Sequence, residues 1–303
     1  MNKTRIVLAG GSGFIGSALA RECLAKYGEV MVLTRSPRKR NDGVREVEWN
    51  GAHPGEWIKV LDGAEAVINL TGKNINCRHT EENVRALMES RVNSVRAIAA
   101  ALGHVHAPPK VWVQAGAIGY YGNAKERICD ENSPNGSDAL SDICRQWEYA
   151  FNSAPAPKTR KVLLRIGVVL GREGGALPVL VRLTKWFLGG SVGSGKQFIS
   201  WIHVKDLMRI FNESLSRADL TGTFNAVGPH PARNREFMRE LRRSLHRPWS
   251  PPAPAWAVKI GSRLMGTEPS LALDSCRVIP KRLAEKGFSF QFPELNTALK
   301  DIL

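Results

Sequence analysis

The first half of the chain alternates short, almost continuously apolar runs with longer segments in which apolar residues recur every three or four positions. The apolar runs predict strands covered on both faces, as in a parallel sheet, and the longer segments predict helices. The predicted strands are residues 5–10, 30–35, 65–72, 110–117 and 161–171, and the predicted helices are residues 13–28, 87–103 and 141–153. This alternation predicts an α/β fold with a doubly wound parallel sheet.

The pattern changes near residue 171, after which helical segments and glycine-rich loops dominate. A proline-rich stretch, residues 246–256, predicts an extended connector, and a further helix is expected between Pro280 and Gly287. We expect residues 1–170, joined again by 202–228, to form one domain. Residues 171–201 and 229–303 are expected to form a smaller C-terminal domain.

The chain has 43 Lys and Arg against 28 Asp and Glu, which gives a net charge of +15 that attracts anions. The densest clusters are residues 35–40 and 238–247. In the second cluster Phe237, Leu241 and Leu245 lie one helical turn apart, so its arginines are expected on a solvated face. The tryptophans do not interleave with either cluster, and we do not expect nucleic acid as a partner.

The five cysteines are scattered, odd in number and in no C-x-x-C pattern. This spacing argues against a disulfide framework and against a zinc site, so we predict no metal and a reducing compartment. The first apolar run is too short for a signal peptide, and no stretch approaches a membrane span. We therefore expect a cytoplasmic protein without a membrane partner.

A glycine motif follows the first predicted strand directly. In GGSGFIG, Gly10, Gly13 and Gly16 stand three apart where the strand would turn into a helix. Such a turn needs residues without Cβ for the tight bend, for the approach of a pyrophosphate and for helix packing, and the N–H groups of the helix face the phosphates. The larger domain is therefore predicted to bind a dinucleotide. The residues expected to do so are Gly10, Ser12, Gly13, Phe14, Ile15 and Gly16.

The end of the second predicted strand bears on which dinucleotide binds. NAD sites usually carry Asp or Glu here to bind the ribose 2′-hydroxyl. This chain has Thr34, Arg35 and Ser36, with Arg38 close by and no carboxylate. A guanidinium binds a 2′-phosphate that a carboxylate would repel. We therefore expect NADP(H) in preference to NAD(H), the alternative being an exposed basic loop.

Several motifs together resemble the extended short-chain dehydrogenases/reductases, the superfamily of nucleotide-sugar epimerases and dehydratases. They are the glycine motif, NLTG at 69–72, GYYG at 119–122, ENSP at 131–134 and VGSGKQFISWIHVKDL at 192–207. More narrowly, residues 189–207, 232–237 and 278–295 resemble an atypical, epimerase-labelled subgroup with a C-terminal domain of unknown function. The resemblance implies a Rossmann-like sheet with a C-terminal substrate domain. It also implies that the cofactor is bordered by Asn69, Leu70, Gly72, Ala115 and Gly116.

Tyr121 and Lys125 have the four-residue spacing of the superfamily's catalytic pair. In the superfamily that pair lies on the helix after the fifth strand, where the lysine lowers the pKa of the tyrosine. Gly122 and Asn123 disfavour a helix here, so we interpret the spacing as a coincidence. The helix expected at 141–153 contains no Tyr–Lys pair, and the usual Ser or Thr near the end of the fifth strand is missing. All three catalytic positions of the superfamily look vacated.

Another group would then have to transfer the proton. Tyr121, Tyr120 and Lys73 are the candidates, with a pocket wall or a structural hydrogen bond as the alternative for each, and Arg145 could replace the lysine as a cation. The loop before residue 203 is expected to edge the substrate cleft. The cleft residues would be Lys73, Gly195, Lys196, Gln197 and Trp201. We read His203 and Asp206 as structural, and we expect a buried partner for Arg165.

Two functions stay open at this point. The first is an NADP(H)-dependent oxidoreductase or epimerase-like enzyme acting on an unidentified small molecule, with anionic and nucleotide-linked compounds among the candidates. The second is a non-catalytic NADP(H)-binding sensor or regulator, which the vacated positions favour. We expect a monomer or a homodimer.

Overall fold

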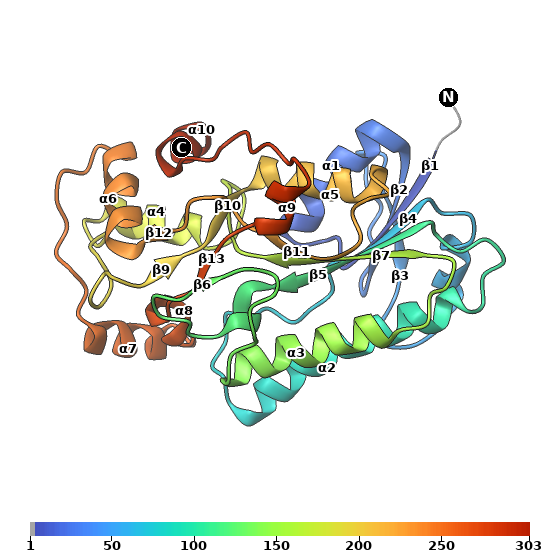
Figure 1. Cartoon of the computed structure of the whole chain (residues 1–303), viewed down its shortest axis with the longest axis horizontal. Coiled ribbons are helices and arrows are strands. Elements are labelled where there is room, and N and C mark those ends of the chain that lie inside the picture. Colours follow the sequence, from blue (N-terminus) through green and yellow to red (C-terminus); the bar gives the residue numbers. More distant parts are fainter. Residues whose placement is uncertain (1–3) are drawn as a thin grey trace.

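The structure, a computed structural model, describes residues 4–303 and is built on one large parallel sheet (Figure 1). The chain passes from β1 to β2 and β3 on one side and then crosses to β4 on the other, which is the doubly wound topology. The predicted Rossmann-like α/β sheet is therefore confirmed. From edge to edge the strands are β11 (Gly222–Ala226), β7 (Arg160–Ile166), β5 (Val111–Ala117), β4 (Ala66–Asn69), β1 (Thr4–Ala9), β2 (Gly28–Thr34) and β3 (Arg45–Glu48).

Helices cover both faces of this sheet. Figure 1 shows α2 (Glu81–Leu102) and α3 (Ala139–Ser153) packed together along one face, while α1 (Phe14–Tyr27) and α5 (Val204–Ser216) lie on the other. Because both faces are covered, the central strands are apolar throughout and their side chains are fully buried. Two short 3₁₀ helices, η1 (Glu56–Val60) and η2 (Ile118–Tyr121), follow β3 and β5.

The single strand predicted for residues 161–171 is wrong, because the chain divides there into two strands of different sheets. After β7, the strand β8 (Val168–Leu170) leaves the large sheet and pairs with β10 (Trp201–His203). The break falls at Gly167, where an added Cβ would lie 2.6 Å from the carbonyl oxygen of Ser200. Only glycine allows the two backbones to approach so closely.

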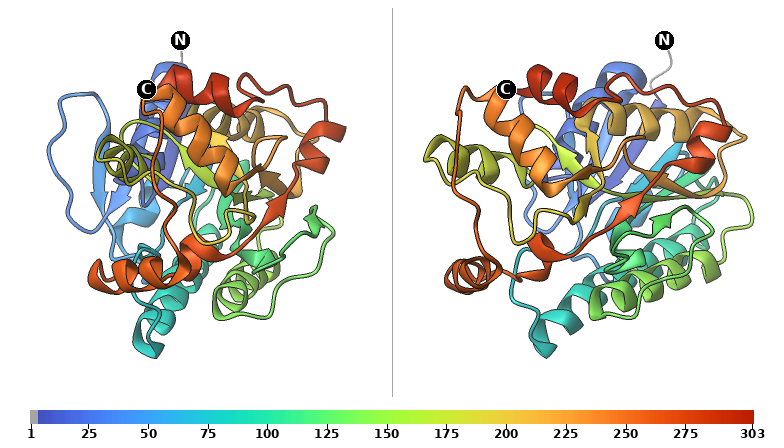
Figure 2. Two further views of the ribbon diagram at one scale, coloured as in Figure 1. Left: turned by 90° about the vertical axis from the view of Figure 1, so that its left-hand side faces the viewer. Right: turned by 60° about the vertical axis from the view of Figure 1, so that its left-hand side comes forward.

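The rest of the chain forms a smaller, mostly helical region beside the sheet. Its apolar cluster includes Leu177, Phe237, Leu241 and Leu299, and Figure 2 shows α6 and α10 side by side over it. The elements are β6 (Ile128–Cys129), α4 (Leu177–Lys185), β9 (Phe198–Ile199), β12 (Ala232–Arg233), α6 (Asn234–Ser244), α7 (Ala255–Leu264), α8 (Ser270–Leu273), β13 (Arg277–Val278), α9 (Lys281–Glu285) and α10 (Leu295–Ile302). The proposed boundary between the two domains stays a prediction.

The C-terminal stretch is anchored to α5 by a buried carboxylate. Asp206, fully buried in the first turn of that helix, accepts hydrogen bonds from the backbone N–H groups of Gln291 at 2.7 Å and Phe292 at 2.8 Å. His203, at the N-cap of the helix, stacks on the Phe292 ring with centroids 4.0 Å apart. The structural reading of His203 and Asp206 is confirmed. Among residues 4–303, no helix has the length and apolar character that a membrane crossing requires.

Candidate cofactor and substrate site

Three glycines shape the turn between β1 and α1, each in a different way. Gly10 has φ of +75°, and a Cβ there would lie 2.9 Å from the backbone of Thr71. A Cβ on Gly16 would lie 2.5 Å from the Cα of Gly11, so helix and turn pack without a side chain between them. A Cβ on Gly13 would meet nothing within 4 Å. Gly10 and Gly16 are thus needed by the fold, whereas Gly13 leaves open space beside the turn.

The helix that follows the turn presents uncompensated positive charge. Helix α1 begins at Phe14 with Gly13 as its N-cap, no side chain caps it, and its first turn contains no acidic residue. Ser12 is exposed and Ile15 is partly buried beside it. The free N–H groups and the helix dipole therefore favour an anion at this end. The phenyl ring of Phe14 packs against Gly171 and Gly174, where an added Cβ would come within 2.5 and 2.7 Å of a ring atom.

Thr71 adds a polar atom that lacks a partner within residues 4–303. Its Oγ1 is buried without a hydrogen bond and lies beside Gly10. A buried hydroxyl is normally paired, so Thr71 Oγ1 is a candidate partner for a ligand bound at this turn. Together with the space at Gly13 and the free end of α1, it fits the pyrophosphate region of a dinucleotide. The sequence analysis missed Thr71, although it stands inside the NLTG motif.

The end of β2 carries cations that no carboxylate neutralises. Arg35, Ser36 and Arg38 are exposed after Thr34, and the two arginines form no ion pair within residues 4–303. The carboxylates nearby are already engaged, because Arg40 donates to Asp42 and to Glu46. A 2′-phosphate on the adenosine ribose would therefore meet free guanidinium groups here.

The end of β4 is held by a buried amide network. The Asn69 side chain donates to Ser94 Oγ and Gln114 Oε1, both at 3.0 Å, and accepts from the backbone N–H of Thr71 at 3.0 Å. Its polar atoms are thus used within the protein, and Asn69 positions Thr71. Leu70 donates its N–H to the Ala9 carbonyl, Gly72 is exposed, and Ala115 and Gly116 are buried within β5.

Tyr121, the first candidate acid, is locked into a buried polar cluster. Its hydroxyl donates to Asn225 Oδ1 at 2.7 Å and accepts from Arg165 Nη1 at 2.8 Å, and the residue is 1% exposed. Arg165 also donates to both carboxylate oxygens of Glu148 at 2.8 Å, which confirms the expected buried partner. Burial raises the pKa of Tyr121 above its ordinary value, although Arg165 opposes the shift.

Tyr121 therefore has the opposite environment from a phenol poised to release a proton, and the structure gives it a structural role. Tyr120 is partly exposed, and the guanidinium carbon of Arg165 lies 3.6 Å from the centre of its ring. Lys125 is exposed in a loop with φ of +54°, so it shares no helical face with Tyr121. The interpretation of the Tyr–Lys spacing as a coincidence is confirmed.

The helix after β5 carries a buried cysteine and an outward-facing arginine. A Cβ on Gly119 would lie 3.5 Å from the Cys144 sulfur, so this thiol lies next to η2. Burial raises the pKa of Cys144 to about 12, which keeps the thiol protonated. Arg145 is exposed and pairs with Asp142 one turn earlier. It does not reach inward to replace the missing lysine.

The predicted cleft residues divide into exposed and buried side chains. Lys73 is exposed, and its Nζ donates to Asn83 Oδ1 at 2.7 Å, while Lys196 is exposed after Gly195, whose φ is +65°. Gln197, in contrast, is buried and donates to the carbonyls of Val192 and Ala272. Trp201 is 1% exposed in the second apolar cluster and donates to the His230 carbonyl. Gln197 and Trp201 therefore hold the loop in place and do not face a ligand.

Two family models match the chain. The model described as the NAD dependent epimerase/dehydratase family matches residues 6–228, and the model described as a domain of unknown function, DUF1731, matches residues 253–302. The chain belongs to the NAD dependent epimerase/dehydratase family. The resemblance seen in the sequence is confirmed for both parts, and the first match covers every element of the glycine turn.

Relatives of this epimerase-family protein span its whole length. The Arabidopsis thaliana "Epimerase family protein SDR39U1 homolog, chloroplastic" is 35% identical over 98% of this chain and 86% of its own. The crystal structure of human epimerase family protein SDR39U1 (isoform2) with NADPH has a TM-score of 0.87 at 33% identity, covering 99% of each chain. A nucleoside-diphosphate sugar epimerase from Corynebacterium glutamicum has a TM-score of 0.79 at 28% identity, covering 100% of this chain and 58% of its own.

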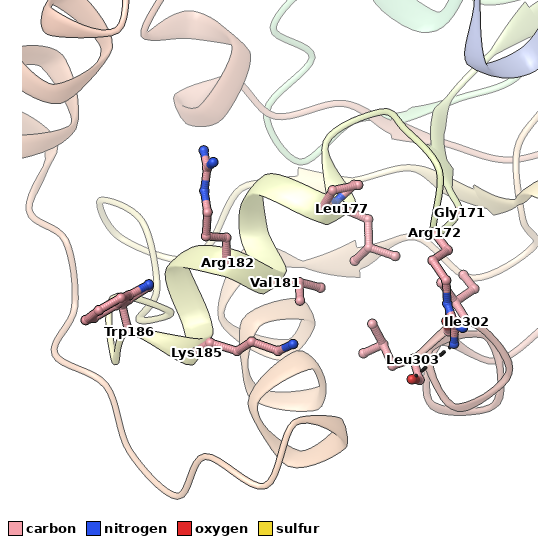
Figure 3. Close-up of a pocket in the computed structure, with 10 residues that line it drawn as sticks. Gly171, Arg172, Leu177, Val181, Arg182, Lys185, Trp186, Ile302 and Leu303 are labelled. Carbon is pink, nitrogen blue, oxygen red and sulfur yellow. Dashed lines mark hydrogen bonds between the residues drawn. The ribbon is translucent and has the colours of Figure 1, made fainter.

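Two hollows of this epimerase-family protein are lined by residues outside the glycine turn itself. Figure 3 shows one of about 340 Å³ between α4 and the end of α10, with Leu177, Val181 and Ile302 as apolar walls and Lys185 at its edge. Another, of about 540 Å³, lies on the surface between α2 and α3. Neither contains a residue predicted for the cofactor or the substrate.

Proposed function

We propose that this epimerase-family protein is an NADP(H)-dependent oxidoreductase. The observation that carries the proposal is the pair of unneutralised guanidinium groups, Arg35 and Arg38, at the end of β2, next to a glycine turn with open space at Gly13. A relative that is 33% identical crystallised with NADPH, which supports the same cofactor here. The cofactor would supply the hydride, and the protein would bind and orient it.

The chain's own residues suggest how the dinucleotide would be held. The pyrophosphate would lie over Gly13 at the free end of α1, within reach of the Thr71 hydroxyl. The adenosine would lie over β2, where Arg35 and Arg38 would bind its 2′-phosphate. Bidentate arginine–phosphate contacts fix orientation as well as charge.

The substrate would be a small anionic molecule. Arg233 and Arg277 both stack on Phe198, with guanidinium carbons 4.5 and 4.7 Å from the ring centre. The exposed Lys196 lies on the same side. Two carboxylates lie against Arg233: Glu126, which pairs with its guanidinium, and Glu236, which accepts from its backbone N–H. A carboxylate or phosphate on the substrate would complement the remaining cations. Lys73 and Tyr120 stay candidates for proton transfer.

A second candidate function is an NADP(H) sensor without turnover. It is favoured by the locked hydroxyl of Tyr121 and by helix α3, where no lysine accompanies a tyrosine. In that case cofactor binding would be retained and reduction of carbonyl compounds would be absent. Nicotinamide absorbance, followed with NADPH and a panel of anionic carbonyl compounds, separates the two functions.

Calorimetric titration with NADPH and NADH tests the cofactor proposal. We expect tighter binding of NADPH, and we expect Arg35→Met to weaken NADPH binding by roughly tenfold, because a charge-assisted hydrogen bond contributes about 1.5–3 kcal/mol. NADH affinity should not change. Arg45→Met is the matched control, since Arg45 is an exposed arginine at the opposite end of the neighbouring strand. Equal affinities for the two cofactors, or an Arg35→Met variant that binds NADPH normally, would contradict the proposal.

A further inference from the structure

Helix α2 contains a partly buried arginine without a counter-charge. Arg91 donates from Nη1 to the Leu87 carbonyl at 2.9 Å and from Nη2 to the Lys73 carbonyl at 3.1 Å. Within residues 4–303 it forms no ion pair, and burial lowers the pKa of its guanidinium. A guanidinium has five N–H donors and stays charged, so three of its donors are left over. Because Arg91 is only partly buried, leftover donors are open to solvent or to a ligand that supplies acceptors.

Arg91 is connected to the glycine turn through the loop that contains Thr71 and Gly72. A Cβ on Gly10 would meet the backbone of Thr71. A Cβ on Gly72, the next residue along the chain, would lie 3.1 Å from the guanidinium carbon of Arg91. Gly72 thus leaves the guanidinium uncovered from that side, and Gly72 itself is exposed. The backbone N–H of Lys73 donates to Ser90 Oγ at 2.9 Å, which fixes this loop on α2.

The neighbouring helix α3 provides no other cation at this place. Arg145 points outward to Asp142. Cys144, which lies close enough to Arg91 to influence its pKa, is a protonated thiol. The Trp147 ring lies against Arg91, 5.2 Å from the guanidinium carbon. The Nε1 of Trp147 is buried without a hydrogen-bond partner in the described residues. Within residues 4–303, Trp147 Nε1 thus lacks a partner, and Arg91 uses two of its donors on the carbonyls of Leu87 and Lys73.

The order of strands decides which half of a dinucleotide lies near Arg91. The adenosine half of a dinucleotide on this turn extends over β2, on one side of β1, whereas Arg91 stands past β4, on the other side. The remaining half, the nicotinamide ribose, falls on the β4 side. Its hydroxyl groups are acceptors for the unused N–H donors.

We propose that Arg91 is the positioning residue for the nicotinamide ribose of the bound cofactor, reaching it from α2 in place of a lysine on α3. This inference rests on the proposed NADP(H) site. Because a guanidinium does not titrate, the ribose would be held equally well across the range of pH in which the protein is folded. The residue binds and orients, and it transfers no proton.

Two ligands of different length separate this role from a general effect on the turn. NADPH contains the nicotinamide ribose, whereas 2′,5′-ADP ends at the adenosine 5′-phosphate and keeps the 2′-phosphate. Calorimetric titration of the full chain with both ligands is the experiment. The variants are Arg91→Met, Arg91→Gln, which keeps a donor for the carbonyls of Leu87 and Lys73, and the control Arg96→Met, an exposed arginine further along α2.

We expect Arg91→Met and Arg91→Gln to weaken NADPH binding about tenfold while 2′,5′-ADP affinity stays within about twofold. Arg96→Met should bind both ligands normally. Equal losses for both ligands, or no loss for NADPH, would overturn the role of Arg91. If Arg91→Met melts too early to titrate, Arg91→Gln decides in the same way. Unaltered protein that binds neither ligand would instead refute the proposed function, and this inference with it.

Discussion

The glycine turn and the Tyr121 cluster lie at the same edge of the sheet, yet they treat their polar groups in opposite ways. Around the turn, the Thr71 hydroxyl, the first N–H groups of α1 and the guanidinium groups of Arg35 and Arg38 have no partner in residues 4–303. In the cluster, Tyr121, Asn225, Arg165 and Glu148 are joined by hydrogen bonds of 2.7–2.8 Å. Unused donors indicate a place for a ligand, whereas a completed hydrogen-bond network indicates a structural role.

The contrast also explains why the four-residue spacing of Tyr121 and Lys125 misleads about the role of the Tyr121 cluster. Tyr121 occupies a position where the sequence suggests chemistry, but Arg165 on β7 and Asn225 on β11 take up both sides of its hydroxyl. These partners are 44 and 104 residues away along the chain. A residue becomes structural here through contacts that local spacing does not reveal.

The largest effect on stability is expected from Arg165→Met. The substitution leaves the Glu148 carboxylate buried and unpaired, since the two side chains are only 6% and 7% exposed. We expect the free energy of unfolding to fall by about 3–5 kcal/mol, measured by urea denaturation. The double variant Arg165→Met/Glu148→Met removes both charges and should recover part of the loss. If Arg165→Met alone has normal stability, the cluster does not stabilise the fold.

A smaller loss is expected from Tyr121→Phe. Without the hydroxyl, Arg165 Nη1 and Asn225 Oδ1 each lose a partner in a buried place, at a cost of about 1–3 kcal/mol. The affinity for NADPH should not change, because this hydroxyl does not face the turn. Tyr149→Phe, at a residue that is 73% exposed, is the control and should alter neither quantity. A large fall in turnover with no fall in stability would reverse the assignment and make Tyr121 catalytic.

The smallest effect on stability, together with a clear effect on binding, is expected from Gly13→Ala. The backbone φ of −84° suits alanine and the new methyl group meets no atom within 4 Å, so the free energy of unfolding should change by no more than about 1 kcal/mol. NADPH affinity should fall about tenfold or more, because the methyl group occupies the approach of the pyrophosphate. Gly261→Ala, likewise in open space, is the control. Undiminished NADPH binding would place the pyrophosphate elsewhere.

Much of the sheet could be predicted because buried parallel strands are apolar along their whole length. Strands β1, β2 and β5 follow the predicted runs closely, whereas β4 covers only 66–69 of the predicted 65–72. Helix α1 ends at Gly28, with φ of +84°, where the sequence indicated. Strand β3, with the sequence REVE, has no such run and was missed. The helices α7 and α8 were missed as well, since few of their residues are buried and their periodicity is correspondingly weak.

The candidate site was predictable where it depends on local backbone geometry and not where it depends on contacts across the fold. The glycine turn and the basic end of β2 are continuous in sequence, so their residue types alone indicate a dinucleotide. Thr71 and Arg91 gain their significance from Gly10 and Gly72, which approach them only in the folded chain. Trp201 and Gln197 were assigned to the cleft because they stand in a distinctive motif, but burial turns both inward.

The carboxylate of Asp206 sets a limit on how this protein can be divided. Residues 253–302 match a family model of their own, which invites expression of that stretch as an independent fragment. Yet Asp206, outside the stretch, receives the amides of Gln291 and Phe292. A truncation ahead of residue 290 would remove two of the hydrogen-bond donors to the buried Asp206 side chain and leave it Arg209, and the excised fragment would lose its anchor. We therefore expect the region at 253–302 to need the rest of the chain in order to keep its fold.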